Sequence, residues 1–222
     1  MKAKEVMIQK FLEMHGRYSA SEIFSDWVRC CALVVSNFTA PHDDLWEERE
    51  KEYLETMRKY NKDEQVTFAE LLAFLTEALE EEMSDVLGEV YMKAEMGSKS
   101  TGQFFTPFHV SELCARLGLG WKELAPDEDG IYRIHEPSCG AGGMIIAACK
   151  ALKDAGINYQ KNVEVIAQDL DWRGVYMTYL QLSLLGVKAI VVQGDTLKEP
   201  YVPGITPSDR IFVTPGKIGV LI

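Results

Sequence analysis

The chain has 222 residues and an apolar share of 47%, enough for one large or two small domains with an ordinary core. It contains no apolar run of about 18 residues and no secretory signal at its start, so we expect a cytoplasmic protein without a membrane span. Five cysteines without a CxxC pair, and four scattered histidines, argue against a disulfide framework and against a metal site.

The negative charge is concentrated in one part of the chain. Residues 41–95 hold 17 acidic and 6 basic residues, which accounts for the whole net charge of −11. A DNA-binding surface is expected to be basic, because phosphate contacts supply most non-specific affinity. No Lys/Arg cluster meets that demand, so either a partner chain binds the DNA or this chain binds DNA poorly.

Helical spacing runs through the first hundred residues. Residues 21–38 form a mostly apolar expected helix, and a second is expected after Pro41. Thr67 and Glu70 have the spacing of a capping box, which predicts that a third helix starts there. The acidic residues occupy the other faces of these helices. They form either a solvated surface or a docking surface for a partner protein.

The pattern changes after a polar stretch at residues 97–102 to alternating strands and helices. The expected strands are residues 131–135, 163–167, 187–192 and 210–213, with expected helices at 142–155 and 171–185. This alternation predicts a parallel sheet with right-handed crossovers. We therefore expect a helical domain over residues 1–100 and an α/β domain over residues 101–222.

A glycine-rich loop, with the sequence EPSCGAGG at residues 136–143, joins the first expected strand to its helix. Glycines there let the backbone approach a ligand closely, and Glu136 can meet a cationic or hydroxyl-bearing group. A generic nicotinamide-binding turn is the alternative. That turn requires glycine at position 145, where this chain has Ile145.

Two aspartates follow the next two strands. Asp169 is placed to accept hydrogen bonds from two ribose hydroxyls. The alternative for Asp169 is a helix N-cap, a role that Asp171 fills better. Asp195 can accept from the exocyclic amine of an adenine ring, or it lies in a plain turn.

A TGQFFTP segment at residues 101–107 precedes the first strand. A capped helix with Thr106 as N-cap and Pro107 as first residue explains those two positions. It does not explain Gln103 or the two phenylalanines.

These four elements, in this order, resemble the N6-adenine DNA methylases of the type I restriction–modification kind. The resemblance implies an α/β, Rossmann-like S-adenosylmethionine (SAM)-dependent methyltransferase sheet, incomplete at the C-terminus and preceded by a helical N-terminal domain. It implies methyl transfer to N6 of adenine in DNA, which is bound through a partner specificity subunit. The implied cofactor-binding residues are Gln103, Phe105, Thr106, Pro107, Glu136, Ser138, Gly140, Ala141, Gly142, Asp169 and Asp195.

By the same resemblance, Glu136 orients the methionine moiety, Asp169 holds the ribose and Asp195 holds the adenine amine. Gly140 and Gly142 line the path of the methionine moiety. Gln103, Phe105 and Thr106 close over the cofactor.

The chain departs from the family at the position of the catalytic Asn/Asp-Pro-Pro-aromatic loop. After the fourth strand it reads TPGK, so Thr214 and Pro215 occupy the catalytic position. A threonine hydroxyl is a poor substitute for an amide acceptor, and Lys217 cannot stack on a base as a ring does. We therefore expect an intact cofactor site with impaired base capture. The apolar residues 218–222 are a candidate substitute edge strand.

Two other functions stay open. One is a non-catalytic module, derived from such a methylase, that binds SAM or a partner protein. The other is a methyltransferase for a small molecule or a protein, favoured by the missing basic patch and disfavoured by residues 103–107.

Overall fold

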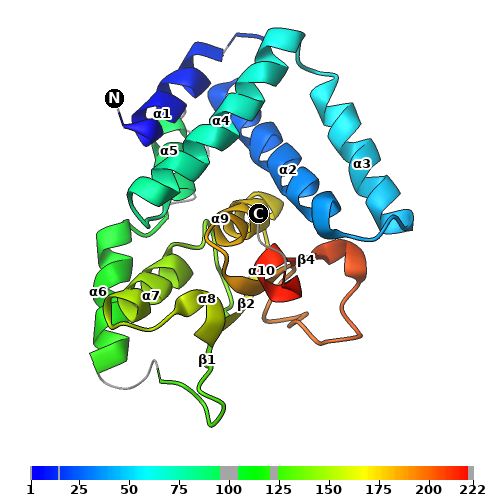
Figure 1. The fold of residues 1–222 in the computed structure, drawn as a ribbon. Helices are drawn as coiled ribbons and strands as arrows, with labels where there is room; N and C mark the ends of the chain where they lie inside the picture. The colour runs from blue at the N-terminus through cyan, green and yellow to red at the C-terminus, as the bar shows by residue number, and fades with distance from the viewer. Residues whose placement is uncertain (1, 15, 96–104, 121–124, 220–222) are drawn as a thin grey trace. The chain divides into compact units, whose positions relative to one another are not determined.

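The computed structural model describes residues 2–14, 16–95, 105–120 and 125–219. It divides into two compact units, residues 1–105 and 106–222. The first unit is helical and the second holds a small, mostly parallel sheet, as Figure 1 shows. The predicted α/β class with a helical N-terminal region is therefore confirmed. The predicted break at residues 97–102 lies outside the described residues, and no described helix is long and apolar enough to cross a membrane.

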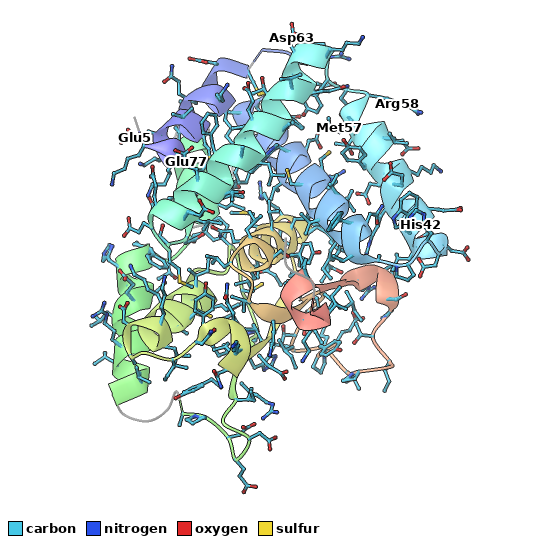
Figure 2. All side chains as sticks on the ribbon, viewed as in Figure 1. Glu5, His42, Met57, Arg58, Asp63 and Glu77 are labelled. Atoms are coloured by element: carbon cyan, nitrogen blue, oxygen red, sulfur yellow. The ribbon has the colours of Figure 1, made fainter. Side chains whose placement is uncertain are left out.

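The first unit is built around a cluster of buried aromatic rings. Its helices are α1 (Ala3–Met14), α2 (Ala20–Thr39), α3 (Asp44–Met57), α4 (Lys62–Glu81) and α5 (Val86–Glu95). Phe11, Phe24 and Trp27 are fully buried, with ring centroids 5.3–6.0 Å apart. The indole N–H of Trp27 donates to the Phe68 carbonyl of α4 at 3.0 Å. The acidic Asp63 and Glu77 of α4, labelled in Figure 2, are exposed on its outer surface.

The start of α4 differs from the sequence prediction. A capping box does open the helix, but it is formed by Asn61 and Glu64. The Asn61 side chain accepts the Glu64 N–H at 3.0 Å, and the Glu64 carboxylate accepts the Asn61 N–H at 2.7 Å. Thr67 lies inside the helix, where its hydroxyl donates to the Asp63 carbonyl. The prediction of a capping box at Thr67 was wrong, because Asn61 and Glu64 form an equivalent capping box earlier in the chain and the helix begins there.

The second unit follows the predicted alternation. Its elements are α6 (Phe108–Gly120), β1 (Tyr132–Glu136), α7 (Gly143–Asp154), α8 (Tyr159–Asn162), β2 (Val163–Asp169), α9 (Trp172–Leu184), β3 (Lys188–Gln193), a short 3-10 turn (Ser208–Arg210), β4 (Ile211–Val213) and α10 (Pro215–Ile218). The strand order is β1-β2-β3-β4, with β1, β2 and β3 parallel. Alternate residues Val163, Val165 and Ala167 of β2 are buried on one face, and α9 packs against β2 and β3. Parallel pairing brings the carboxyl ends of these three strands to one edge, called here the carboxyl edge.

The fourth strand does not follow the prediction of a wholly parallel sheet. β4 runs antiparallel to β3, with Phe212 opposite Val191. A parallel neighbour requires a crossover of a dozen or more residues that is usually helical, whereas residues 194–207 form turns and loop. Phe212 is buried and contacts the rings of Trp172, Tyr176 and Tyr179 of α9 at 5.1–6.3 Å. These contacts fix β4 on the outer edge of β3.

The chain after β4 is hydrogen-bonded to the start of β3. The fully buried Thr214 hydroxyl donates to the Val187 carbonyl at 2.7 Å and accepts the Ala189 N–H at 2.8 Å. The Thr214 N–H donates to the Ala189 carbonyl at 3.0 Å. A Cβ on Gly216 would lie 2.8 Å from the Gly186 carbonyl oxygen, so a larger residue there requires backbone movement. Ile218 ends α10, so it does not start the predicted edge strand, and residues 220–222 lie outside the described part.

Replacing Thr214 by valine keeps the shape of the side chain and leaves the buried Ala189 N–H without its partner. We expect the free energy of unfolding to fall by about 1–3 kcal/mol, measured by urea titration with circular dichroism. Thr206→Val is the control, because that hydroxyl accepts the Val202 N–H in an exposed loop and its loss is expected to cost under about 0.5 kcal/mol. Equal stabilities of the two variants would contradict the role given to Thr214.

Candidate cofactor site

The glycine loop, residues 136–143, connects β1 to α7 with a backbone that only glycine adopts readily. Gly140 and Gly142 have φ values of +54° and +91°. The Gly142 N–H donates to the Cys139 carbonyl at 2.7 Å, and a Cβ on Gly142 would lie 3.2 Å from the Thr178 hydroxyl. Burial raises the pKa of the Cys139 thiol to about 12. The loop is therefore shaped for close approach of a ligand and offers no thiolate nucleophile at Cys139.

Asp169, at the end of β2, holds this loop in place. One carboxylate oxygen accepts the Gly140 N–H at 2.7 Å, and the other accepts the Asp171 N–H at 2.9 Å. A carboxylate has about four acceptor positions, so two backbone bonds leave capacity for further donors. The alternative N-cap role falls to Asp171, whose side chain accepts the Arg173 N–H at 3.1 Å, as predicted.

The segment after β3 is hydrogen-bonded to the end of β2 and to the glycine loop. The Gly194 N–H donates to the Asp169 carbonyl at 2.9 Å, and the Thr196 hydroxyl donates to the Pro137 carbonyl at 2.6 Å. Partial desolvation raises the pKa of Asp195, but the Leu197 N–H and the Lys198 ammonium outweigh it and hold the pKa below its usual value. Asp195 is therefore ionised at neutral pH, as an acceptor must be to receive an amine hydrogen strongly.

The structure brings most of the predicted cofactor residues together at the carboxyl edge. They are Glu136, Ser138, Gly140, Ala141, Gly142, Asp169 and Asp195. Glu136 is half-buried, and its carboxylate accepts the Ser138 N–H at 3.3 Å. Ala141 is 1% exposed and its carbonyl accepts the Gln181 side-chain amide at 2.8 Å, so it packs inward.

Sequence reasoning missed the face of α9 that supports the glycine loop. Gly174, Thr178 and Gln181 are spaced along one helix face. Thr178 donates to the Gly140 carbonyl at 2.9 Å, and Gln181 donates to the Ala141 carbonyl. The spacing of these small and polar residues along a buried helix was the sequence signal that could have indicated this supporting face.

Two exposed leucines beside the aspartates were also missed. Leu170 follows Asp169 and is 67% exposed, and Leu197 is 95% exposed two residues after Asp195. Apolar side chains that stand free at the carboxyl edge can cover the faces of a flat, apolar ring. The edge thus offers carboxylates for hydroxyl or amine donors next to apolar contact surface.

The predicted covering segment is only partly described. Gln103 lies outside the described residues, and Phe105 belongs to the first unit, where its ring meets Tyr91 edge-on at 5.4 Å. Thr106 and Pro107 are exposed, and the Pro107 carbonyl accepts the Val110 N–H at 2.8 Å. Pro107 therefore precedes α6 instead of being its first residue.

The residues predicted at the catalytic position, Thr214 and Pro215, do not join this cluster. Thr214 is bonded to Val187 and Ala189, at the amino end of β3, whereas Asp195 follows its carboxyl end. Ala189 and Gln193 are four residue steps apart along β3, a distance of roughly 13 Å at about 3.3 Å per residue. The physical reason for this placement is that antiparallel pairing of β4 brings the residues that follow it to the amino end of β3.

A methyl group added at Gly174 tests how tightly α9 supports the loop. Its Cβ would lie 3.0 Å from the Asp169 carboxyl carbon and 3.1 Å from the Gly140 carbonyl oxygen. We expect Gly174→Ala to lower the free energy of unfolding by about 1–3 kcal/mol through overpacking, measured by urea titration. Gly120→Ala is the control, because nothing lies within 4 Å of its Cβ. A Gly174→Ala protein as stable as the control would show that the loop has room to shift.

The chain is similar in sequence to known DNA methylases. The model of the family described as N-6 DNA Methylase matches residues 82–216, more than half of the chain. The Type I restriction enzyme MpnII methylase subunit of Mycoplasma pneumoniae is 34% identical over 73 residues, which cover 31% of this chain and 12% of that protein.

A solved structure is also similar. It is the methyltransferase subunit of a type I restriction-modification system from Streptococcus thermophilus, at 19% identity and a TM-score of 0.45, with 73% of this chain and 35% of that chain covered. This chain therefore spans about a third or less of the length of these relatives. The family match over more than half of its residues identifies the chain as a member of the N-6 DNA methylase family, similar to type I methylase subunits.

Proposed function

We propose that the second unit binds SAM at the carboxyl edge, and that this chain alone does not methylate adenine in DNA. The observation that supports the first half is the hydrogen bond from the Gly140 N–H to the Asp169 carboxylate, which holds the glycine loop against the end of β2. The second half rests on Thr214, which is buried at the opposite end of β3.

The residues at the carboxyl edge fit the chemistry of SAM, which supplies a methyl group activated by a sulfonium. Asp169 keeps free acceptor positions for the ribose hydroxyls, and Asp195 is ionised and able to receive the adenine amine. Glu136 provides a carboxylate for the methionine ammonium, and the glycines leave space beside it. Leu170 and Leu197 provide apolar cover for the adenine ring.

Base capture is the function that the TPGK segment does not provide. An adenine amine needs an acceptor next to the methyl group, and a flipped base needs a stacking surface. The Thr214 hydroxyl is occupied by Val187 and Ala189. Lys217 pairs with Glu164 at 2.8 Å, and this hydrogen bond lowers the pKa of Glu164. Methylation therefore requires an amine acceptor and a stacking surface from outside residues 214–217.

A non-catalytic module is the second candidate. The same burial of Thr214 favours it, together with the exposed acidic residues on α3 and α4 that suit a basic partner protein. In this second candidate, SAM bound by the chain is not used for methyl transfer, even when the chain is assembled with partner chains.

Calorimetric titration of the chain with SAM tests the cofactor site. We expect Asp169→Ala to weaken binding at least about tenfold, since it removes charge-assisted hydrogen bonds to the ribose and frees the Gly140 N–H. Asp209→Ala, on the exposed turn before β4, is the matched control and is expected to bind like the unaltered chain. If the unaltered chain did not bind SAM, the proposed cofactor site would be wrong, and the non-catalytic module would remain as the candidate function.

Transfer of radiolabelled methyl groups from SAM to unmethylated DNA tests base capture. We expect no transfer by the chain alone, and none by the double variant Thr214→Asn with Lys217→Phe. Both altered positions remain at the amino end of β3, and an asparagine there must fit a space shaped for threonine. Robust methylation of adenine by either protein would contradict the proposal.

A further inference from the structure

Within the described part of the second unit, helix α6 packs through one of its faces. Helix α6 lies along α7, as Figure 1 shows. Phe108, Ser111 and Ala115 of α6 are buried. On this side Glu112 pairs with Lys150 at 2.7 Å. These contacts account for the attachment of the helix to its own unit.

The opposite face of α6 carries an exposed apolar stripe. Val110, Leu113 and Leu117 are 38%, 58% and 41% exposed, and Cys114 is exposed beside them. Positions separated by three, four and seven residues lie on the same side of a helix. Single exposed apolar residues are ordinary, but a contiguous stripe along a helix indicates an interaction surface.

We propose that this stripe, residues 110, 113, 114 and 117, packs antiparallel against the same stripe of a second copy of the chain. The spacing is symmetric about the point between Leu113 and Cys114. A two-fold axis through that point places Val110 opposite Leu117 of the second copy, and Leu113 opposite Cys114. Such self-complementarity is what a two-fold interface requires of one surface patch.

The charges favour a second copy at this surface over a strongly charged partner. The stripe itself holds no ionisable side chain except the Cys114 thiol, and the neighbouring Arg116 pairs with Asp154 of its own chain at 3.3 Å. Residues 106–222 contain 13 acidic and 11 basic residues, whereas the excess negative charge lies in residues 41–95. An interface formed by α6 therefore joins two units that each carry only a small net charge.

Sedimentation velocity of the full chain over a range of concentrations measures the association. We expect a dimer whose dissociation constant rises at least about tenfold in Leu113→Glu, because the substitution buries two carboxylates near the axis. Val66→Glu is the matched control, since Val66 is 59% exposed on α4, and it is expected to dimerise normally. A monomer at every concentration, or a dimer unchanged by Leu113→Glu, would overturn the proposal.

Cross-linking with a short bismaleimide gives a second readout that needs no altered helix face. The other four cysteines are buried, so we expect a cross-linked dimer through Cys114 that disappears in Cys114→Ser. A Cys114 thiol that resists alkylation in a monomeric chain would show that another part of the same chain covers the stripe. That result would also overturn the proposal.

Discussion

The hydrogen bond from the Gly140 N–H to the Asp169 carboxylate joins the two parts on which the candidate site depends. It fixes the glycine loop against the end of β2, while Thr178 and Gln181 of α9 hold two of the loop's carbonyls. The same aspartate contributes its own carbonyl to Gly194, and so connects the loop after β3. One residue, through its side chain and its main-chain carbonyl, thus connects the segments that follow three neighbouring strands.

The direction of β4 separates the candidate cofactor site from the TPGK segment, residues 214–217. A parallel β4 would end at the carboxyl edge and bring the next residues to the cofactor. The antiparallel β4 instead delivers Thr214 to Val187 and Ala189, at the other end of β3. Gly216 fits closely against Gly186, where a side chain would collide. The TPGK segment is therefore suited to holding an edge strand.

Local patterns predicted the helical first unit, the β-α alternation and the cluster of Glu136, Asp169 and Asp195, because glycine conformations and strand ends are encoded by neighbouring residues. The capping box of α4 was misplaced because two candidate boxes lie within one segment. The pairing of β4 could not be read from its sequence, since it depends on long-range packing of Phe212 against α9. The supporting role of Gly174 was missed for the same reason: only the fold shows which backbone it approaches.

Nuclear magnetic resonance of the full chain tests the strand arrangement most directly, through contacts between backbone protons. The account predicts cross-strand contacts between Ile190 and Val213 and between Val192 and Ile211, as the antiparallel register requires. It predicts none between β4 and β1. Contacts of Ile211–Val213 with Tyr132–Glu136 of β1 would place β4 at the other edge of the sheet and would contradict the separation of Thr214 from the candidate cofactor site.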